Sequence, residues 1–506
     1  MEDAGRPPIR KVTILGGGTA GWMAAAALSQ RAKGLDIAIT LVESEAIGTI
    51  GVGEATVPQI RHFNAALGFD EAEYMRETKA TFKLGIEFRN WGRVGDRYVH
   101  PFGVLGLPLD GVEFHQQWAC ARAEGIDRHI DLLSLPSAMC RIDRFGSPAT
   151  DPNDIRSSFS YAYQFDAGLY ARYLRRYAEA RGVERIEGKV ARVERDEATA
   201  DVVALELESG QRVAGELFID CSGFRGLLIE EALGAGYEDW SHWLPCDRAV
   251  ALPCASAPGS ITPYTRATAQ DHGWIWRIPL QHRTGNGHVY CSGFTDADTA
   301  EAQLRAQLDG EALAPPNHLR FVTGRRRKQW MNNVIAMGLA AGFTEPLEST
   351  SINMIQIAIG RLLDLFPRQG DNRVKRDEFN RLMQLEHERI RDFIILHYCA
   401  TQRDDTPFWR YVRNMALPDS LQARIESFKE RGIIMAYRDG MFLPASWIAV
   451  MVGQNIIPQH FDPRCAMVGM NDRSAWLDEV ERRFSQAAAN FPDHVQHLKS
   501  IGAYAA

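Results

Sequence analysis

The chain has 506 residues, with 57 Lys and Arg against 64 Asp and Glu and a formal net charge of −7. This length exceeds what one hydrophobic core usually supports, so we expect two or three lobes. The sequence has no basic run that would track a phosphate backbone, which argues against a nucleic-acid partner. It also lacks a signal-peptide core and any apolar run of ~18 residues, which argues against secretion and membrane spanning.

The eight cysteines are scattered along the chain and form no C-x-x-C pair. Such a distribution favours neither a metal site nor a redox pair. We therefore predict no bound metal and a reducing, cytoplasmic environment.

The first predicted elements form a βαβ unit. An apolar strand over residues 11–15 leads into the turn GGGTAG, an alanine-rich helix over 22–32 and a second strand over 36–43. This order predicts an open parallel sheet near the start of the chain.

The turn of that unit carries a dinucleotide-binding signature. Gly16, Gly18 and Gly21 spell G-x-G-x-x-G between strand and helix, and Glu43 ends the second strand. Glycines let the backbone approach a pyrophosphate at a helix N-terminus, and an acidic side chain at this position accepts from ribose hydroxyls. The motif alone leaves FAD and NAD open.

Two later stretches favour FAD. Residues 47–56, IGTIGVGEAT, form a second glycine-rich loop that suits an extended dinucleotide, and residues 217–226, LFIDCSGFRG, end an apolar strand in small residues. A purely structural strand and turn is the alternative interpretation of each stretch.

The middle of the chain predicts an inserted lobe and a return to the first sheet. Residues 92–152 are rich in Pro, Gly and aromatics and lack long helical periodicity. A helix is predicted over 168–182. We expect three strands to follow and to rejoin the first sheet, over residues 190–196, 202–209 and 216–223.

After residue 351 the pattern is mostly helical. The predicted organisation is therefore an α/β fold with a Rossmann-like, FAD-binding sheet of the flavin monooxygenase type. We expect this core over residues 10–365, with inserted lobes near 92–152 and 235–330. A helical C-terminal region over 366–506 would cover the substrate.

Residues 338–356, GLAAGFTEPLESTSINMIQ, place two glutamates around a proline and follow them with three hydroxyl side chains. One interpretation is a helix start, with Ser349, Thr350 or Ser351 as the cap and the isoleucines after it as the buried face. The other is a functional site that needs a carboxylate and small donors together.

Seven motifs together resemble one family. GGGTAGWM, IGVGEAT, FKLGIEFRNW, FIDCSGFRGLLI, GWIWRIP, FTEPLESTS and RDDTPFW occur in the order found in the flavin-dependent tryptophan halogenases. The resemblance covers about residues 10–415. It implies an enzyme that uses reduced FAD and oxygen to convert chloride or bromide into hypohalous acid, which travels through an internal channel to a lysine near an aromatic substrate.

The resemblance assigns the reacting groups. The catalytic lysine would be Lys83, either as a hydrogen-bond donor to hypohalous acid or as a haloamine, and Lys79 is its competitor nearby. Glu348 would be the active-site glutamate that polarises the halogenating species or accepts the proton of the arenium intermediate. Backbone N–H groups of Thr350 and Ser351 would hold the halide at a helix N-terminus.

The family's glycine is replaced by serine at position 351, which leaves the halide preference open, and Glu345 is expected to be structural.

Further roles follow from the same resemblance. Trp274 and Trp276 would shield the flavin, and His100, Phe102 and Trp447 would line the substrate pocket. Besides the motif glycines and Glu43, the expected cofactor contacts are Gly17, Ala20, Ser44, Ile47, Ile50, Ala55, Val190, Leu339 and Ile352.

One region departs from the family. Residues 435–458 lack the set of Tyr, Glu, Phe and Trp that grips the amino-acid end of tryptophan in tryptophan-specific members. A zwitterion could not be desolvated there without such partners. We therefore expect an indole or another electron-rich aromatic as substrate.

The sequence carries a single well-placed dinucleotide motif, so we expect a separate flavin reductase to supply FADH2. The resemblance leaves open a homodimer. Two alternatives remain: a flavin monooxygenase that hydroxylates an aromatic substrate directly, and a non-catalytic flavin-binding sensor.

Overall fold

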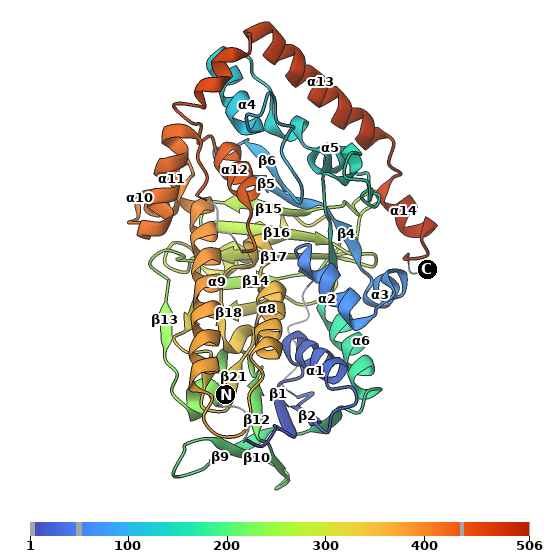
Figure 1. Cartoon of the computed structure of the whole chain (residues 1–506), viewed down its shortest axis with the longest axis vertical. Coiled ribbons are helices and arrows are strands. Elements are labelled where there is room, and N and C mark those ends of the chain that lie inside the picture. Colours follow the sequence, from blue (N-terminus) through green and yellow to red (C-terminus); the bar gives the residue numbers. More distant parts are fainter. Residues whose placement is uncertain (1–5, 47–52, 436–439, 505–506) are drawn as a thin grey trace.

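The computed structural model describes residues 6–46, 53–435 and 440–504. The seven-stranded sheet crosses the middle of the molecule, and the six-stranded sheet lies at one end of the long axis (Figure 1). At the other end lie α4 (Phe114–Ala123), α5 (Leu135–Arg141), α12 (Pro444–Gly453) and α13 (Met470–Ala489). Among the described residues, no helix is both long and apolar enough to span a bilayer.

The six-stranded sheet is built from the predicted βαβ unit. β1, β2, β8, β12 and β21 pair in parallel, and only β20 pairs antiparallel, at the edge. In spatial order its strands are β20 (Trp330–Met331), β21 (Val334–Ala336), β12 (Leu217–Asp220), β1 (Lys11–Leu15), β2 (Ala38–Glu43) and β8 (Glu184–Glu187). Helix α1 (Thr19–Arg31) contacts β1, β2, α6 (Ala167–Glu179) and α8 (Ser351–Asp364). The predicted α/β fold class is confirmed.

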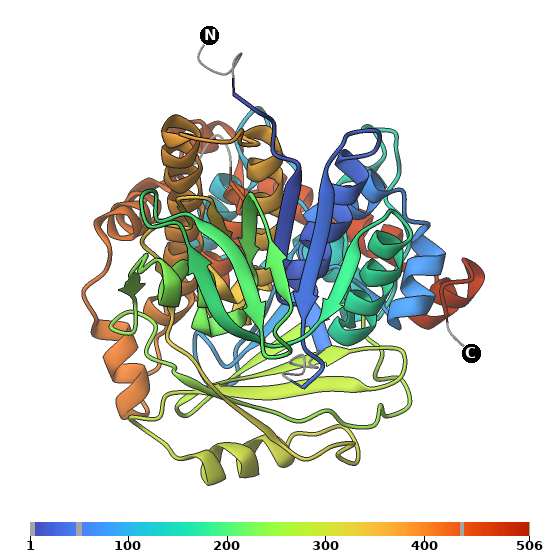
Figure 2. The same ribbon diagram turned by 90° about the horizontal axis from the view of Figure 1, so that it is seen from below.

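The seven-stranded sheet is antiparallel except where β15 pairs with β5. Its order is β18 (Asn317–Arg320), β14 (Arg248–Ala251), β17 (Thr284–Tyr290), β16 (Gly273–Pro279), β15 (Thr265–Gln270), β5 (Gly85–Arg89) and β6 (Arg97–Pro101). Seen from below, its yellow-green strands lie beneath the blue and green strands of the six-stranded sheet (Figure 2).

Three smaller sheets complete the strands. They are β3 (Gly53–Ala55), β7 (Ala162–Asp166) and β4 (Thr81–Lys83); β9 (Val190–Arg195), β10 (Val202–Leu207) and β11 (Arg212–Ala214); and β13 (Tyr237–Asp239), β19 (Gly324–Arg326) and β22 (Gly342–Phe343). The remaining α-helices are α2 (Gln59–Leu67), α3 (Glu71–Thr78), α4 (Phe114–Ala123), α5 (Leu135–Arg141), α7 (Ala297–Arg305), α9 (Arg373–Cys399), α10 (Pro407–Asn414), α11 (Asp419–Arg431), α12 (Pro444–Gly453), α13 (Met470–Ala489) and α14 (His494–Ser500).

Two sequence expectations about strands are wrong. The strands expected over 190–196 and 202–209 do not rejoin the first sheet but pair with each other as the hairpin β9–β10; only β12 returns to β1. A hairpin can satisfy its backbone locally, so its alternating pattern does not reveal which sheet it joins.

The alternation of apolar residues over 82–89 predicts one strand with one apolar face, but the segment is divided at Leu84, whose N–H donates to the carbonyl of Pro263 and whose carbonyl accepts from Phe102. Residues 82–88 are buried on both faces, including Lys83 and Glu87.

Candidate active site

A one-turn 3-10 helix, η6 (Pro346–Glu348), links β22 to α8 and carries one glutamate at each end. Pro346 fixes the first position, and Ser349 ends the turn with a left-handed φ of 58°. A non-glycine residue in that conformation is held there by its surroundings. Glu345 and Glu348 are both fully buried.

Two histidines enclose the carboxylate of Glu348. Nδ1 of His100 lies 2.8 Å from Oε2, and Nε2 of His397 lies 2.8 Å from Oε1. The other ring nitrogen of His397 is 2.8 Å from the carbonyl oxygen of Phe393, so both nitrogens of this ring face oxygen atoms. Burial would raise the pKa of Glu348, but the two histidines outweigh it and lower the pKa to about 2. The carboxylate is therefore ionised at neutral pH.

Lys83 lies on the other side of the η6 turn. Its Nζ donates to the carbonyl of Thr56 at 3.0 Å and to Oγ of Ser349 at 2.9 Å, and it faces the ring of Phe102 at 5.1 Å. Burial lowers the pKa of Lys83 to about 7, although the charge of Glu348 acts in the opposite direction. The structure therefore brings Lys83 and Glu348 to one turn, with a lysine that can exchange its proton near neutrality.

Glu345, which we expected to be structural, anchors the tryptophan of the WIW motif. Its Oε2 accepts from Nε1 of Trp274 at 2.8 Å and from the hydroxyl of Tyr398 at 2.5 Å. Burial raises the pKa of Glu345 to about 7. Since His397 and Tyr398 are neighbours on α9, one end of that helix holds both glutamates of η6.

The start of α8 suits an anion. Thr350 is the N-cap residue, but no side chain caps the helix, and Oγ1 of Thr350 is buried without a partner among the described residues. The expectation that Ser349, Thr350 or Ser351 caps this helix is correct in position, since Thr350 is the N-cap residue, but the side chain of Thr350 makes no capping hydrogen bond to the described residues. N–H groups at an uncapped helix start are available to an anion, and Thr350 and Ser351 are the residues that carry them here.

Aromatic rings gather beside His100. The rings of His100 and Phe102 lie 6.4 Å apart, Phe393 lies 5.6 Å from His100, and Phe393 meets Trp447 edge-on at 4.9 Å. Phe442 stacks on Phe393 at 3.8 Å. A hollow of about 10 Å³ remains beside Phe442 and Trp447, about the room one water needs. The three residues predicted to line the pocket thus lie in one aromatic group.

The two tryptophans predicted to shield the flavin lie near this aromatic group. Trp274 and Trp276 lie next to each other on β16, with ring centres 6.2 Å apart, and both are buried. Trp91 lies between Trp274, at 6.5 Å, and His397, at 6.1 Å.

The glycine loop after β1 is a tight cradle. A Cβ on Gly16 would lie 2.2 Å from the carbonyl oxygen of Cys221, and one on Gly17 would lie 1.4 Å from Oε2 of Glu43. Gly18 begins α1 in an extended conformation without a side-chain cap. Glu43 itself is held by Arg185 at 2.5 Å. Only glycine fits at positions 16 and 17, and the start of α1, which no described side chain caps, can receive a pyrophosphate.

Of the other predicted cofactor residues, Ala20 and Leu339 lie near this cradle. A Cβ on Gly338, the first residue of η5 (Gly338–Ala340), would lie 2.8 Å from Ala20 of α1. The turn η5, which contains Leu339, therefore packs closely against the start of α1. Ser44 and Ala55 lie at the end of β2 and in β3, Ile352 lies in the first turn of α8, and Val190 begins β9. Ile47 and Ile50 lie outside the described residues.

Sequence reasoning missed several residues of this site: His397, Tyr398, Phe393, Thr56 and Ser349 as a side-chain partner. The first three come from the interior of the 27-residue helix α9. A weak signal was present, because His397 and Tyr398 interrupt an apolar run that is otherwise typical of a buried helix. No group of His, Cys, Asp and Glu among the described residues could hold a metal ion.

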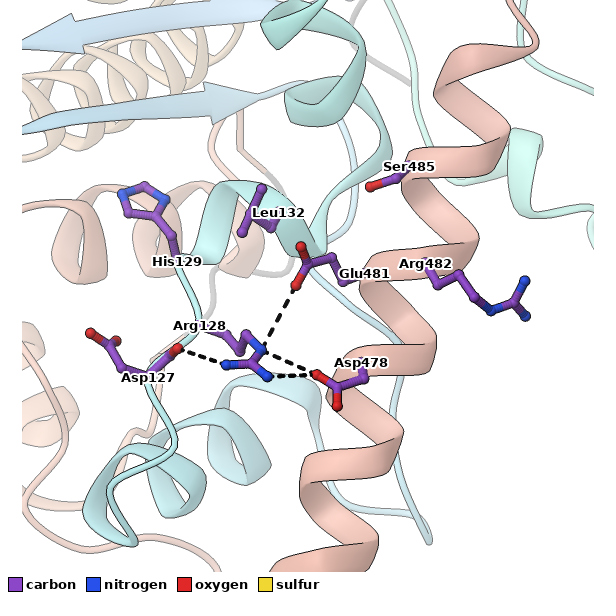
Figure 3. A pocket seen from close by; sticks show the side chains of 8 residues that line it. All are labelled: Asp127, Arg128, His129, Leu132, Asp478, Glu481, Arg482 and Ser485. Atoms are coloured by element: carbon purple, nitrogen blue, oxygen red, sulfur yellow. Dashed lines mark hydrogen bonds and ion pairs between the residues drawn. The ribbon is translucent and has the colours of Figure 1, made fainter.

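A larger hollow of about 580 Å³ lies elsewhere, between the 3-10 helix η1 (Ile130–Leu133) and α13 (Figure 3). Arg128 crosses it and binds Asp478 at 2.7 Å. Arg128 also reaches Glu481 at 3.8 Å, and none of the residues that line this hollow belongs to the site around Glu348.

Comparisons with known proteins place the chain beside one family. The model of the tryptophan halogenase family matches residues 11–470. The tryptophan 6-halogenase SttH of Streptomyces toxytricini is 36% identical, over 97% of this chain and 98% of its own. The tryptophan 7-halogenase RebH of Lentzea aerocolonigenes is 37% identical, over 93% and 94%.

Among solved structures, the flavin-dependent halogenase BrvH from Brevundimonas sp. BAL3 superposes with a TM-score of 0.94 at 44% identity, covering 98% of this chain and 99% of its own. The flavin-dependent halogenase Xcc4156 from Xanthomonas campestris gives 0.93 at 46%, with the same coverage.

Proposed function

We propose, from the premise that this chain belongs to the tryptophan halogenase family and is a flavin-dependent halogenase, that it halogenates an electron-rich aromatic of the indole type with chloride or bromide. The observation that carries the proposal is the convergence of Lys83 and Glu348 on one buried turn, where Lys83 bonds to Ser349, the residue next to Glu348.

The glycine cradle fits FAD. Gly16 and Gly17 let the turn lie close to Cys221 and Glu43, where a Cβ would clash, and the start of α1, which no described side chain caps, would receive the pyrophosphate. Glu43 would turn from Arg185 or share its carboxylate with the ribose. When bound, reduced FAD supplies, together with oxygen, the two-electron oxidation of a halide to hypohalous acid. A separate flavin reductase would provide the reduced cofactor.

The halide would bind at the first N–H groups of α8, at Thr350 and Ser351. The unpaired Oγ1 of Thr350 offers an additional donor there. A serine at position 351 keeps the backbone N–H, so either chloride or bromide can be held.

Lys83 would hold and aim the oxidised halogen. As an ammonium it has three N–H groups; two donate to Thr56 and Ser349, and among the described residues no acceptor is present for the third. The third can donate to the oxygen of hypohalous acid and make the halogen more electrophilic. The face of Phe102 toward Nζ and the charge of Glu348 favour this ammonium form.

Glu348 would stabilise the cationic intermediate and take its proton. His100 and His397 keep it ionised, and they fix both oxygens by hydrogen bonds. Trp274 and Trp276 would keep the organic substrate away from the cofactor, so that only the small oxidised halogen passes.

The substrate class is proposed from charge. Residues 440–458 contain no Asp, Glu, Lys or Arg that could pair with an amino-acid end, and Arg438 and Asp439 before them lie outside the described residues. This lack of charge over 440–458 favours indole over tryptophan. Tryptophan is the competing candidate, because SttH and RebH are named tryptophan halogenases.

A competition assay tests this proposal. The protein, FAD, a flavin reductase, NADH and oxygen are supplied with equal indole and tryptophan, first with bromide, then with chloride, and products are read by mass spectrometry. We expect halogenated indole to dominate. A preference for tryptophan would overturn the substrate assignment, and hydroxylated product without halide would favour a direct monooxygenase.

The protein would work in the cytoplasm, which its eight free cysteines support.

A further inference from the structure

The strand that carries Lys83 is held on its outer edge by the far end of the chain. β4 is the last strand in the order β3–β7–β4, so within that sheet only one of its edges is paired. At its free edge, the backbone N–H of Phe82 donates to Nε2 of His494, at 3.2 Å. His494 is the first residue of α14, and in Figure 1 α13 and α14 run down the side of the molecule on which β4 lies.

The second nitrogen of His494 fixes its role. Nδ1 lies 3.1 Å from the carbonyl oxygen of Ile261 and must donate to it, so Nε2 is left as an acceptor. The side chain is fully buried, and burial lowers the pKa of His494 to about 4. A neutral imidazole therefore joins two backbone groups, one from β4 and one from the loop before β15.

We propose that His494 is a positioning residue for Lys83: by binding the N–H of Phe82, it sets the place of β4 and thus of the lysine that aims the oxidised halogen. Lys83 follows Phe82 directly and reaches two partners on other elements, Thr56 and Ser349. A shift of β4 by about 1 Å would move Nζ of Lys83 away from Thr56 and Ser349, and such a misplacement can cost about 100-fold in rate.

The packing around Phe82 supports this assignment. The ring of Phe82 stacks on Phe145 at 3.9 Å, and His494 lies 6.1 Å from Phe82. His497, one turn further along α14, lies 5.6 Å from Phe82 but forms no hydrogen bond from its buried Nε2 to any described residue. The helix thus offers one histidine that binds the strand and one that only packs against it.

The experiment compares four variants by the yield of halogenated indole per oxygen consumed, beside oxygen uptake, FAD binding and the thermal midpoint. His494→Phe keeps a ring and removes both hydrogen bonds. His494→Gln keeps an acceptor and a donor at the spacing of the two ring nitrogens. His494→Asn carries the same amide on a shorter side chain, and His497→Phe is the matched control.

We expect His494→Phe to lower the yield per oxygen by about 10- to 100-fold, with oxygen uptake within about 2-fold of wild type and more free hypohalous acid trapped in solution. His494→Gln should restore the yield, His494→Asn should fall between, and His497→Phe should match wild type. If His494→Phe does not fold, the yield per oxygen of His494→Asn tests the inference in its place.

An unchanged yield per oxygen in His494→Phe, or an equal loss in His497→Phe, would overturn the inference, as would a loss that Gln does not restore. The inference rests on the proposed halogenation, but the two fail differently. A wild-type enzyme that makes no halogenated product refutes the proposed function, whereas normal wild-type product with unaffected His494 variants refutes only the role of His494.

Discussion

Replacing Lys83 with methionine should make the protein more stable and abolish halogenation. Methionine has a similar length but no charge, so the variant removes the cation and keeps the volume. The stability gain follows from the cost of burying that cation, and the loss of product from the missing donor to hypohalous acid.

The magnitude can be worked from the burial of Lys83. Burial lowers the pKa of Lys83 from 10.5 to about 7, and each pH unit corresponds to about 1.4 kcal/mol, so the ionised lysine costs the folded state about 5 kcal/mol at pH 7 and below. The hydrogen bonds to Thr56 and Ser349, at about 1 kcal/mol each, are lost in the variant. We expect a net gain of about 1–4 kcal/mol in the free energy of unfolding.

The sign of the pH dependence is fixed by the same values. Between pH 7 and 10.5 the unfolded chain binds more protons at this residue than the folded one, so the wild type gains stability as pH rises. The advantage of Lys83→Met should therefore be largest at or below pH 7 and shrink by about 1.4 kcal/mol per pH unit above it.

Urea unfolding at pH 7, 8 and 9 measures the difference in free energy of unfolding between Lys83→Met and the wild type. Oxygen uptake and halogenated indole are measured at pH 7. Lys79→Met is the control, because Lys79 is partly exposed at the end of α3; we expect it to change stability by less than about 0.5 kcal/mol and to keep product. A Lys83→Met variant that is less stable at pH 7, a gap that stays constant with pH, or retained product would refute the reasoning.

Three further variants test the groups around Lys83. Glu348→Gln should leave oxygen uptake intact and slow halogenation by about 100- to 10,000-fold; normal product in this variant would remove Glu348 from the chemistry. His397→Asn should raise the pKa of Glu348 from about 2 by about 1–2 pH units, so the acid limb of the product-versus-pH profile should move to higher pH, and an unmoved limb would contradict the role of His397. Trp274→Phe removes one donor to Glu345 and should raise the oxygen consumed per halogenated product, whereas an unchanged ratio would argue against Trp274 as a wall.

Much of the cofactor region could be predicted from the sequence because it is built locally. The glycines of GGGTAG and the strand before them specify their turn within a few residues, and a Cβ at Gly16 or Gly17 is excluded by close contacts. The βαβ unit, helix α6 and the helical end of the chain were predicted for the same reason: hydrophobic periodicity is a local property.

The candidate site was only partly visible. Lys83 and Glu348 were identified by resemblance, but nothing in the spacing indicated that Ser349 joins them or that His100 and His397 enclose Glu348. His397 lies 49 residues from Glu348, and His494 lies 412 residues from Phe82. Such pairs depend on how whole elements pack, which residue types alone do not encode.

Short-range sterics and hydrophobic periodicity set the α/β class and the dinucleotide turn, and both can be read from the sequence. The tertiary structure decided which sheet β9 and β10 join and that the segment around Lys83 divides at Leu84. It also decided the protonation of the site, because burial moves the pKa of Lys83 toward neutrality while neighbouring histidines hold Glu348 ionised. Desolvation and charge proximity exist only once distant segments have packed together.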